Sequence, residues 1–62
     1  MNSKRQMKEI KITTQHNWTG HIVTDTSIVP VTVDTDTWVS VRFEVKGLRG
    51  VARLIDVQER EI

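Results

Sequence analysis

The sequence predicts a small all-β protein, an antiparallel meander of about five strands arranged as a curled sheet or a partial barrel. Nine Val, six Ile and eight Thr make 23 of the 62 residues β-branched, and such side chains pack well on a pleated surface. Polar and apolar residues alternate over several segments, which is typical of half-buried strands. Alanine and leucine, which favour helices, are scarce.

The first residues of the chain are polar and basic. We expect residues 1–6 to form a frayed basic arm and residues 7–62 to form a single small β domain. No apolar segment follows the basic arm, so the N-terminus does not resemble a secretory signal. No uncharged run approaches the length of a membrane span. These features predict a cytoplasmic protein with no membrane partner.

The first half of the chain predicts three strands separated by turns. They are strand 8–14, turn 15–20, strand 21–24, turn 25–27 and strand 28–33. In the first strand Ile10 and Ile12 alternate with charged residues. Pro30 cannot donate a hydrogen bond to a neighbouring strand, so the third strand should lie at an edge or carry a bulge.

The second half predicts a long hairpin. After a turn over residues 34–36, Val39, Val41, Phe43 and Val45 alternate with polar residues, which predicts a strand over residues 37–46. Gly47 and Gly50 supply the positive φ angles of a tight turn. A strand over residues 51–55 should follow, with Glu44 opposite Arg53 and Phe43 opposite Leu54. This strand–turn–strand unit resembles those of small SH3-like barrels. If the sheet closes into a partial barrel, we therefore expect that barrel to be SH3-like.

The last residues allow two structures. Asp56 and Glu59 fit a capping box for a short C-terminal helical turn from Val57 to about Glu61. Alternatively, the last strand continues to Glu59. The predicted core consists of Ile10, Ile12, Ile22, Val29, Val31, Val39, Val41, Phe43, Val45 and Leu54.

Basic and aromatic residues of the predicted hairpin are the candidate contacts for a partner. Clustered cations bind phosphates and aromatic rings stack on bases, whereas Trp and Arg are also frequent at protein interfaces. On the hairpin, one face would carry Trp38, Arg42, Lys46 and Arg53, with Arg49 at the tip. Trp18, in the first turn, is a second aromatic candidate. The net charge of +1 is too small for a dedicated nucleic-acid-binding domain.

Catalytic and metal-binding chemistry find little support. The chain has no Cys, and therefore neither a thiol nucleophile nor thiolate metal ligands. His16 and His21 flank a turn, but a metal site needs three or four ligands. Asp34 and Asp36 lack the Gly and Glu of a calcium loop. We therefore expect no enzyme, no metal and no cofactor.

A chain of this length buries only about 60% of its unfolded surface, so it needs additional support. The segment 51–55 is apolar on both faces, and a second subunit could cover one of them. We expect a homo-oligomer, with a dimer favoured, that acts by binding a larger protein. The alternatives are a nucleic-acid-binding accessory protein and a small enzyme with its site at an oligomer interface.

Overall fold

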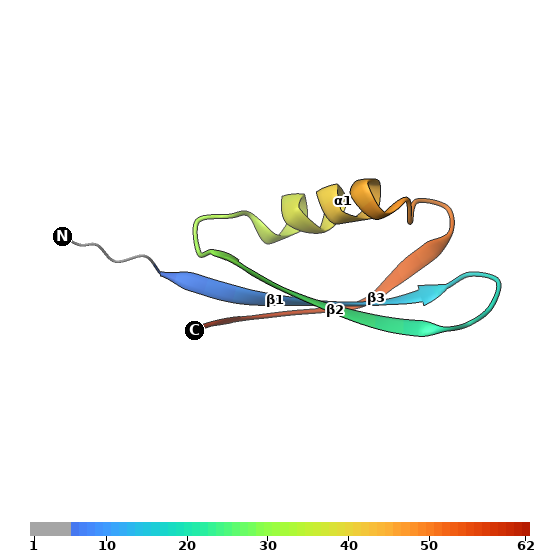
Figure 1. Cartoon of the computed structure of the whole chain (residues 1–62), viewed down its shortest axis with the longest axis horizontal. Helices are drawn as coiled ribbons and strands as arrows, with labels where there is room; N and C mark the ends of the chain where they lie inside the picture. Colours follow the sequence, from blue (N-terminus) through green and yellow to red (C-terminus); the bar gives the residue numbers. More distant parts are fainter. Residues whose placement is uncertain (1–5) are drawn as a thin grey trace.

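A computed structural model describes residues 6–62, which form a three-stranded antiparallel sheet with one helix on one face (Figure 1). The elements are β1 (Met7–His16), β2 (Ile22–Pro30), α1 (Thr35–Lys46) and β3 (Ala52–Glu61). The sheet order is β2-β1-β3, with β1 in the centre. Apart from Gln6, the predicted basic arm lies outside the described residues.

The sequence prediction is confirmed at the level of a mostly β fold with an antiparallel sheet. The five strands and the SH3-like partial barrel are wrong, because three longer strands and a helix take their place. Among the described residues, no helix is both long and apolar enough to cross a membrane.

The central strand β1 follows the predicted alternation. Its even-numbered residues face the helix, where Ile10 and Ile12 are buried, and its odd-numbered residues lie on the opposite, open face. The turn that follows contains Gly20 with φ of 78°, a left-handed conformation that glycine adopts without steric cost. The first predicted strand and turn are thus confirmed.

A single strand, β2, replaces the two strands predicted on either side of residues 25–27. The predicted turn there is wrong, because β1 pairs with β2 without a register shift from Met7–Pro30 to Gln15–Ile22. Asp25 is tolerated within the strand because its carboxylate pairs with Lys46 at 2.7 Å. Pro30 ends an edge strand, as predicted.

The segment predicted as the strongest strand is the helix α1, so the strand over residues 37–46 is wrong. Asp34 is the N-cap, with its carboxylate accepting from the Thr37 N–H at 3.0 Å. Gly47 is the C-cap, with φ of 66°. Both are recognised helix-end residues. The alternating valines outweighed these two helix-end signals in the sequence prediction. In the helix, Trp38 and Arg42 lie on one side because they are four residues apart.

The predicted hairpin therefore does not form. Residues 47–50 connect α1 to β3 instead of joining two strands, so the cross-strand pairs predicted for Phe43 and Glu44 are absent from the described sheet. Phe43 and Leu54 still approach each other, because both line a shallow hollow between α1 and β3. Glu44 instead pairs with Arg49 at 2.9 Å.

The chain ends in a continuous strand, β3, so the helical turn predicted for residues 57–61 is wrong and the alternative of a continued strand is confirmed. The pairing register with β1 shifts between Thr13 and Thr14, which leaves Ile55 as a bulge. Such an extra residue bends an edge strand locally.

The core is smaller than predicted. Of the ten predicted core residues, only Ile10, Ile12 and Val29 are buried. Val31, Val39 and Phe43 are half-buried, whereas the other four are exposed, namely Ile22, Val41, Val45 and Leu54. α1 contains no fully buried residue. Trp38 and Val39, with Val33 from the preceding loop, pack partly against the core.

We predict that Ile10→Ala destabilises the protein by about 2–5 kcal/mol, because it empties the centre of a core with few side chains. That is a large share of the stability of a domain this small, about 3–9 kcal/mol. Urea unfolding at fixed protein concentration measures the change. The control is Ile62→Ala, since Ile62 is 71% exposed. Equal effects of the two substitutions would contradict this description of the core.

Candidate functional site

Polar contacts attach both ends of α1 to the sheet. At its N-terminus Lys8 is nearly buried, and its ammonium group donates to Thr35 Oγ1 and pairs with Glu59, each at 3.1 Å. Thr35 also donates to Glu59. Because a buried ammonium group requires a partner, this cluster ties β1, β3 and the start of the helix together.

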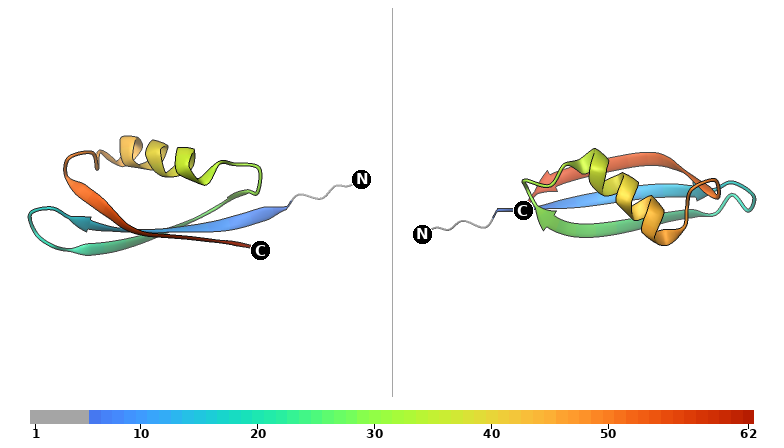
Figure 2. Two further views of the ribbon diagram at one scale, coloured as in Figure 1. Left: turned by 180° about the vertical axis from the view of Figure 1, so that it is seen from behind. Right: turned by 90° about the horizontal axis from the view of Figure 1, so that it is seen from above.

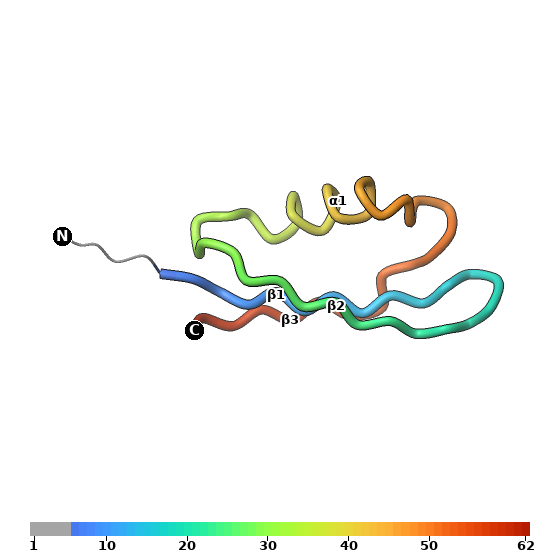
Figure 3. Tube along the Cα trace, in the orientation of Figure 1, coloured from blue at the N-terminus to red at the C-terminus, as the bar shows by residue number. Residues whose placement is uncertain are grey.

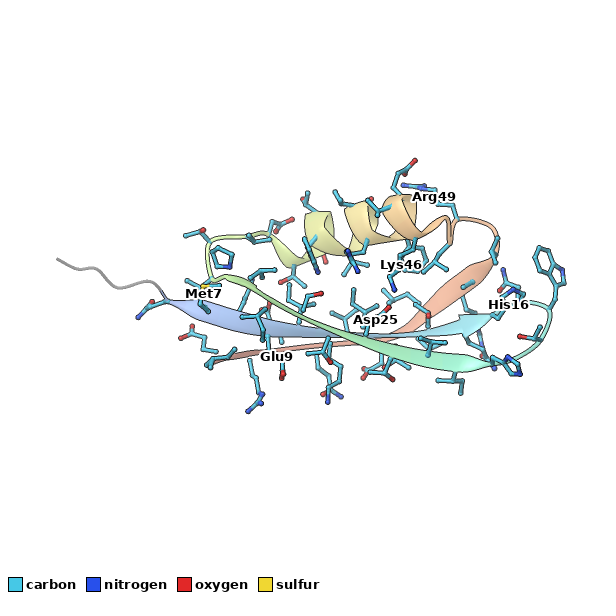
Figure 4. The ribbon with its side chains drawn as sticks, in the orientation of Figure 1. Met7, Glu9, His16, Asp25, Lys46 and Arg49 are labelled. Atoms are coloured by element: carbon cyan, nitrogen blue, oxygen red, sulfur yellow. The ribbon has the colours of Figure 1, made fainter. Side chains whose placement is uncertain are left out.

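The C-terminal end of α1 is attached to the other edge strand. Figure 4 shows Lys46 reaching from the helix towards Asp25 of β2, and their ion pair measures 2.7 Å. Between the two ends, the Arg42 guanidinium lies 5.5 Å from the centre of the Trp38 ring, within cation–π range. The helix therefore crosses the sheet diagonally, from β3 at its start to β2 at its end (Figure 2).

The outer edge of β2 presents free backbone groups. At the two ends of its ladder with β1, His16 N–H donates to His21 O at 2.9 Å and Val31 N–H donates to Gln6 O at 3.2 Å. Bonded pairs alternate along an antiparallel ladder, so the odd-numbered residues of β2 bond to β1. The outward N–H groups belong to Ile22, Thr24, Thr26 and Ile28. None of them has a backbone partner among residues 6–62.

Exposed apolar side chains surround this edge. Ile22, Val23 and Ile28 on the strand are 61%, 52% and 52% exposed. Val41 and Val45 lie one helical turn apart on the flank of α1 opposite the side that meets Leu54 of β3, and are 47% and 71% exposed. We call these five residues, with the outer edge of β2, the β2 surface. It holds half of the ten large exposed hydrophobic residues of the described chain.

The two sheet edges differ in charge. β2 carries one charged residue, Asp25, which Lys46 neutralises beneath the helix. β3 carries five, namely Arg53, Asp56, Glu59, Arg60 and Glu61, together with the bulge at Ile55. Charges and bulges are the usual means by which proteins prevent an edge strand from pairing with another chain. The edge of β3 is thus protected against pairing with another chain, whereas the edge of β2 is not.

A second exposed feature lies where the β1–β2 turn meets the connection between α1 and β3, at one end of the molecule (Figure 3). Asn17 joins the two loops, through its backbone N–H to Val51 O at 2.8 Å and its amide to Gly50 O at 3.3 Å. We call residues 16–21 and 47–53 the loop end.

At the tip of the loop end, Trp18 contacts His16 through both its backbone and its ring. His16 Nδ1 accepts from the backbone N–H groups of Trp18 and Thr19, each at 3.1 Å. The two rings meet edge to face at 5.5 Å between centroids. Trp18 nevertheless remains 75% exposed, which is unusual for so large an apolar side chain.

The structure separates the six predicted contact residues. Trp38, Arg42 and Lys46 lie on α1 and face the sheet or β2, and Lys46 is engaged with Asp25. Arg49 lies on the outer side of the helix end (Figure 4), and Arg53 bonds to Gln15 at 3.1 Å. The last three of the six, Trp18, Arg49 and Arg53, belong to the loop end.

The β2 surface was missed by sequence reasoning because the predicted turn over residues 25–27 divided the strand. The available signal was that residues 26–33 carry no charge and contain four apolar β-branched residues, Ile28, Val29, Val31 and Val33. One hollow, with a volume of about 300 Å³, lies on the open face around the ion pair of Glu9 with Arg60. That ion pair neutralises two of its charged groups.

Three carboxylates have pKa values held below the usual range. Hydrogen bonds from the Thr37 hydroxyl and N–H lower the pKa of Asp34. The Thr35 hydroxyl and the Lys8 ammonium lower the pKa of Glu59. A hydrogen bond from Arg60 lowers the pKa of Glu9. In each case the charged form is favoured by folding.

We predict that acid destabilises the fold through these groups. Their folded pKa values lie below the unfolded ones, so the stabilisation is present above about pH 4 and is lost as the pH falls through the folded values. Thermal melting between pH 2 and pH 7 measures this. Glu59→Gln should make the acid-side decline shallower, whereas Glu61→Gln, which leaves the Lys8 cluster intact, should not. The opposite ranking would contradict the assignment.

Comparisons of the chain with protein-family models, with curated proteins and with solved structures gave no match. The proposals that follow are therefore argued from the geometry of the described residues.

Proposed function

We propose that this is a non-enzymatic binding protein whose working form is a homo-oligomer, with a dimer favoured. The observation that carries the proposal is the imbalance, within residues 6–62, between three buried hydrophobic residues and ten large exposed ones. Half of the exposed residues gather at the β2 surface. Exposed apolar residues that cluster in this way mark an interaction site, whereas single apolar residues scattered over a surface do not.

Self-association would stabilise the folded state of such a small chain. Each square ångström of apolar surface removed from water contributes about 25 cal/mol, and a fold of this size has little stability to spare. Covering the β2 surface would enlarge the apolar interior without additional chain. It would also satisfy the outward backbone groups of β2, which pair with no residue of the described part.

We predict that the mass measured by sedimentation equilibrium rises with concentration from 7.2 kDa towards a dimer. We also predict that the melting temperature rises with protein concentration, because association stabilises only the folded chain. A monomer over the whole range from low micromolar to millimolar concentration would contradict the proposal.

The loop end is the surface we propose for a larger protein partner. The Trp18 backbone N–H donates to His16 Nδ1, and the Trp18 ring meets the His16 ring edge to face while 75% of the side chain is exposed. Aromatic side chains presented in this way are frequent energetic centres of protein interfaces. The loop end lies away from the middle of β2, so self-association leaves it accessible.

Nucleic acid is the second candidate ligand of the loop end. The observation in its favour is that Arg49 and Arg53 lie in the same loop cluster as Trp18, so cations and an aromatic ring are combined. Such a combination suits an unpaired nucleotide strand, in which bases stack and phosphates pair. Against it, Arg49 is already paired with Glu44 and the net charge is only +1.

We predict that Trp18→Ala abolishes capture of a protein partner from the native host, whereas Ile62→Ala does not. The two substitutions remove side chains of similar exposure, 75% and 71%. Capture should survive nuclease and moderate salt. Capture that disappears with nuclease, together with binding of single-stranded DNA or RNA that weakens steeply with salt, would instead establish the nucleic-acid function.

A further inference from the structure

We propose that two copies of the chain pair through β2, antiparallel and with Thr26 on the two-fold axis, to form a continuous six-stranded sheet. The strand order would be β3-β1-β2-β2-β1-β3, with both helices on the same face. This inference rests on the proposed self-association and deepens it, because it names the partner surface as the β2 surface of a second copy and fixes the register.

The register follows from the outward backbone groups. Thr26 is the middle residue of β2 (Ile22–Pro30), and it is one of the residues whose N–H and C=O point away from β1. With Thr26 on the axis, each Thr26 N–H meets the carbonyl of its copy. Thr24 and Ile28 of one chain exchange hydrogen bonds with Ile28 and Thr24 of the other. Pro30, which has no N–H, lies opposite Ile22 of the copy at the end of the ladder, where only the bond from the Ile22 N–H to the Pro30 carbonyl can form.

Charge disfavours one of the two neighbouring registers. With Asp25 on the axis, two carboxylates would face each other in a close, non-hydrogen-bonded pair, about 4.5 Å between Cα atoms, and like charges directly opposite are destabilising. With Thr26 on the axis, Asp25 faces Ser27 of the other chain and keeps its ion pair with Lys46. The isologous contact is then free of charge repulsion along the whole strand.

The side chains of the β2 surface match this arrangement. On the helix face, Val23, 52% exposed, would lie opposite the buried Val29 of the second copy. α1 ends over β2 (Figure 2). Val41 and Val45 lie on the flank of α1 opposite the Leu54 side, so the two helix ends would approach across the axis with apolar side chains between them. On the open face, Ile28 would pack against Thr24 of the copy.

The first test uses cross-linking of cysteine variants, since the chain has no Cys of its own. In the proposed dimer the two Thr26 Cα atoms lie about 5.5 Å apart, whereas those of Thr24 lie about 14 Å apart. A short bismaleimide should therefore join Thr26→Cys into a covalent dimer efficiently and Thr24→Cys poorly. Gln58→Cys reports on pairing through β3. Efficient linking of Gln58→Cys with none of Thr26→Cys would overturn the proposal.

The second test blocks each edge in turn. Thr26→Pro removes an outward N–H of β2, and Val57→Pro removes an outward N–H of β3, so neither breaks a bond to β1. Thr26→Pro should weaken dimerisation roughly 30-fold through the two lost hydrogen bonds, and Val57→Pro should leave it unchanged. Circular dichroism checks that each variant is folded. If Thr26→Pro does not fold, the cross-linking of the cysteine variants decides between the two edges.

The outcomes separate this inference from the proposed function. A wild-type monomer at every concentration removes both. A wild-type dimer that Val57→Pro abolishes and Thr26→Pro preserves keeps self-association but overturns pairing through β2. A dimer whose Thr24→Cys variant cross-links faster than Thr26→Cys overturns the register.

Discussion

Every other strand of this protein depends on β1, because β2 and β3 pair only with it and the helix packs over it. Its even-numbered residues supply the buried Ile10 and Ile12, and its Lys8 is the ammonium group around which Thr35 and Glu59 converge. A single strand therefore provides two of the three buried core residues and the polar attachment of the start of α1. This arrangement is economical for a short chain, but it leaves two strand edges and one sheet face without cover.

The helix is attached differently from a helix in a larger domain. It buries no residue completely, and its ends are held by the Lys8–Glu59–Thr35 cluster on one side and the Lys46–Asp25 pair on the other. Partly exposed ion pairs contribute modestly, so the apolar contacts of Trp38 and Val39 with the core remain important. A second chain against the β2 surface would add apolar contacts on the flank of α1 where this chain offers none.

The two edges of the sheet show how one small protein can restrict where it associates. β3 combines five charges with a bulge, and β2 has a single charge that is already paired. In the proposed dimer this difference would direct pairing to one edge and limit growth beyond two chains, because the outer edges of the six-stranded sheet would be the protected ones. The loop end with Trp18 lies outside this contact and remains available for a second partner.

The sequence by itself determined the features that depend on neighbouring residues. These are the alternation that makes residues 8–14 a strand, the turn that contains Gly20, the position of Pro30 at an edge and the mostly β class. Only the tertiary structure decided that residues 35–46 form a helix, since alternating valines predict a strand, and in the helix Val39 packs partly against the core whereas Val41 and Val45 are exposed. The connection from β2 to β3 must pass over β1, and parallel strands need such a crossover. The same crossover dispersed the predicted basic face and left the uncharged edge of β2 open, because both depend on which segments lie side by side.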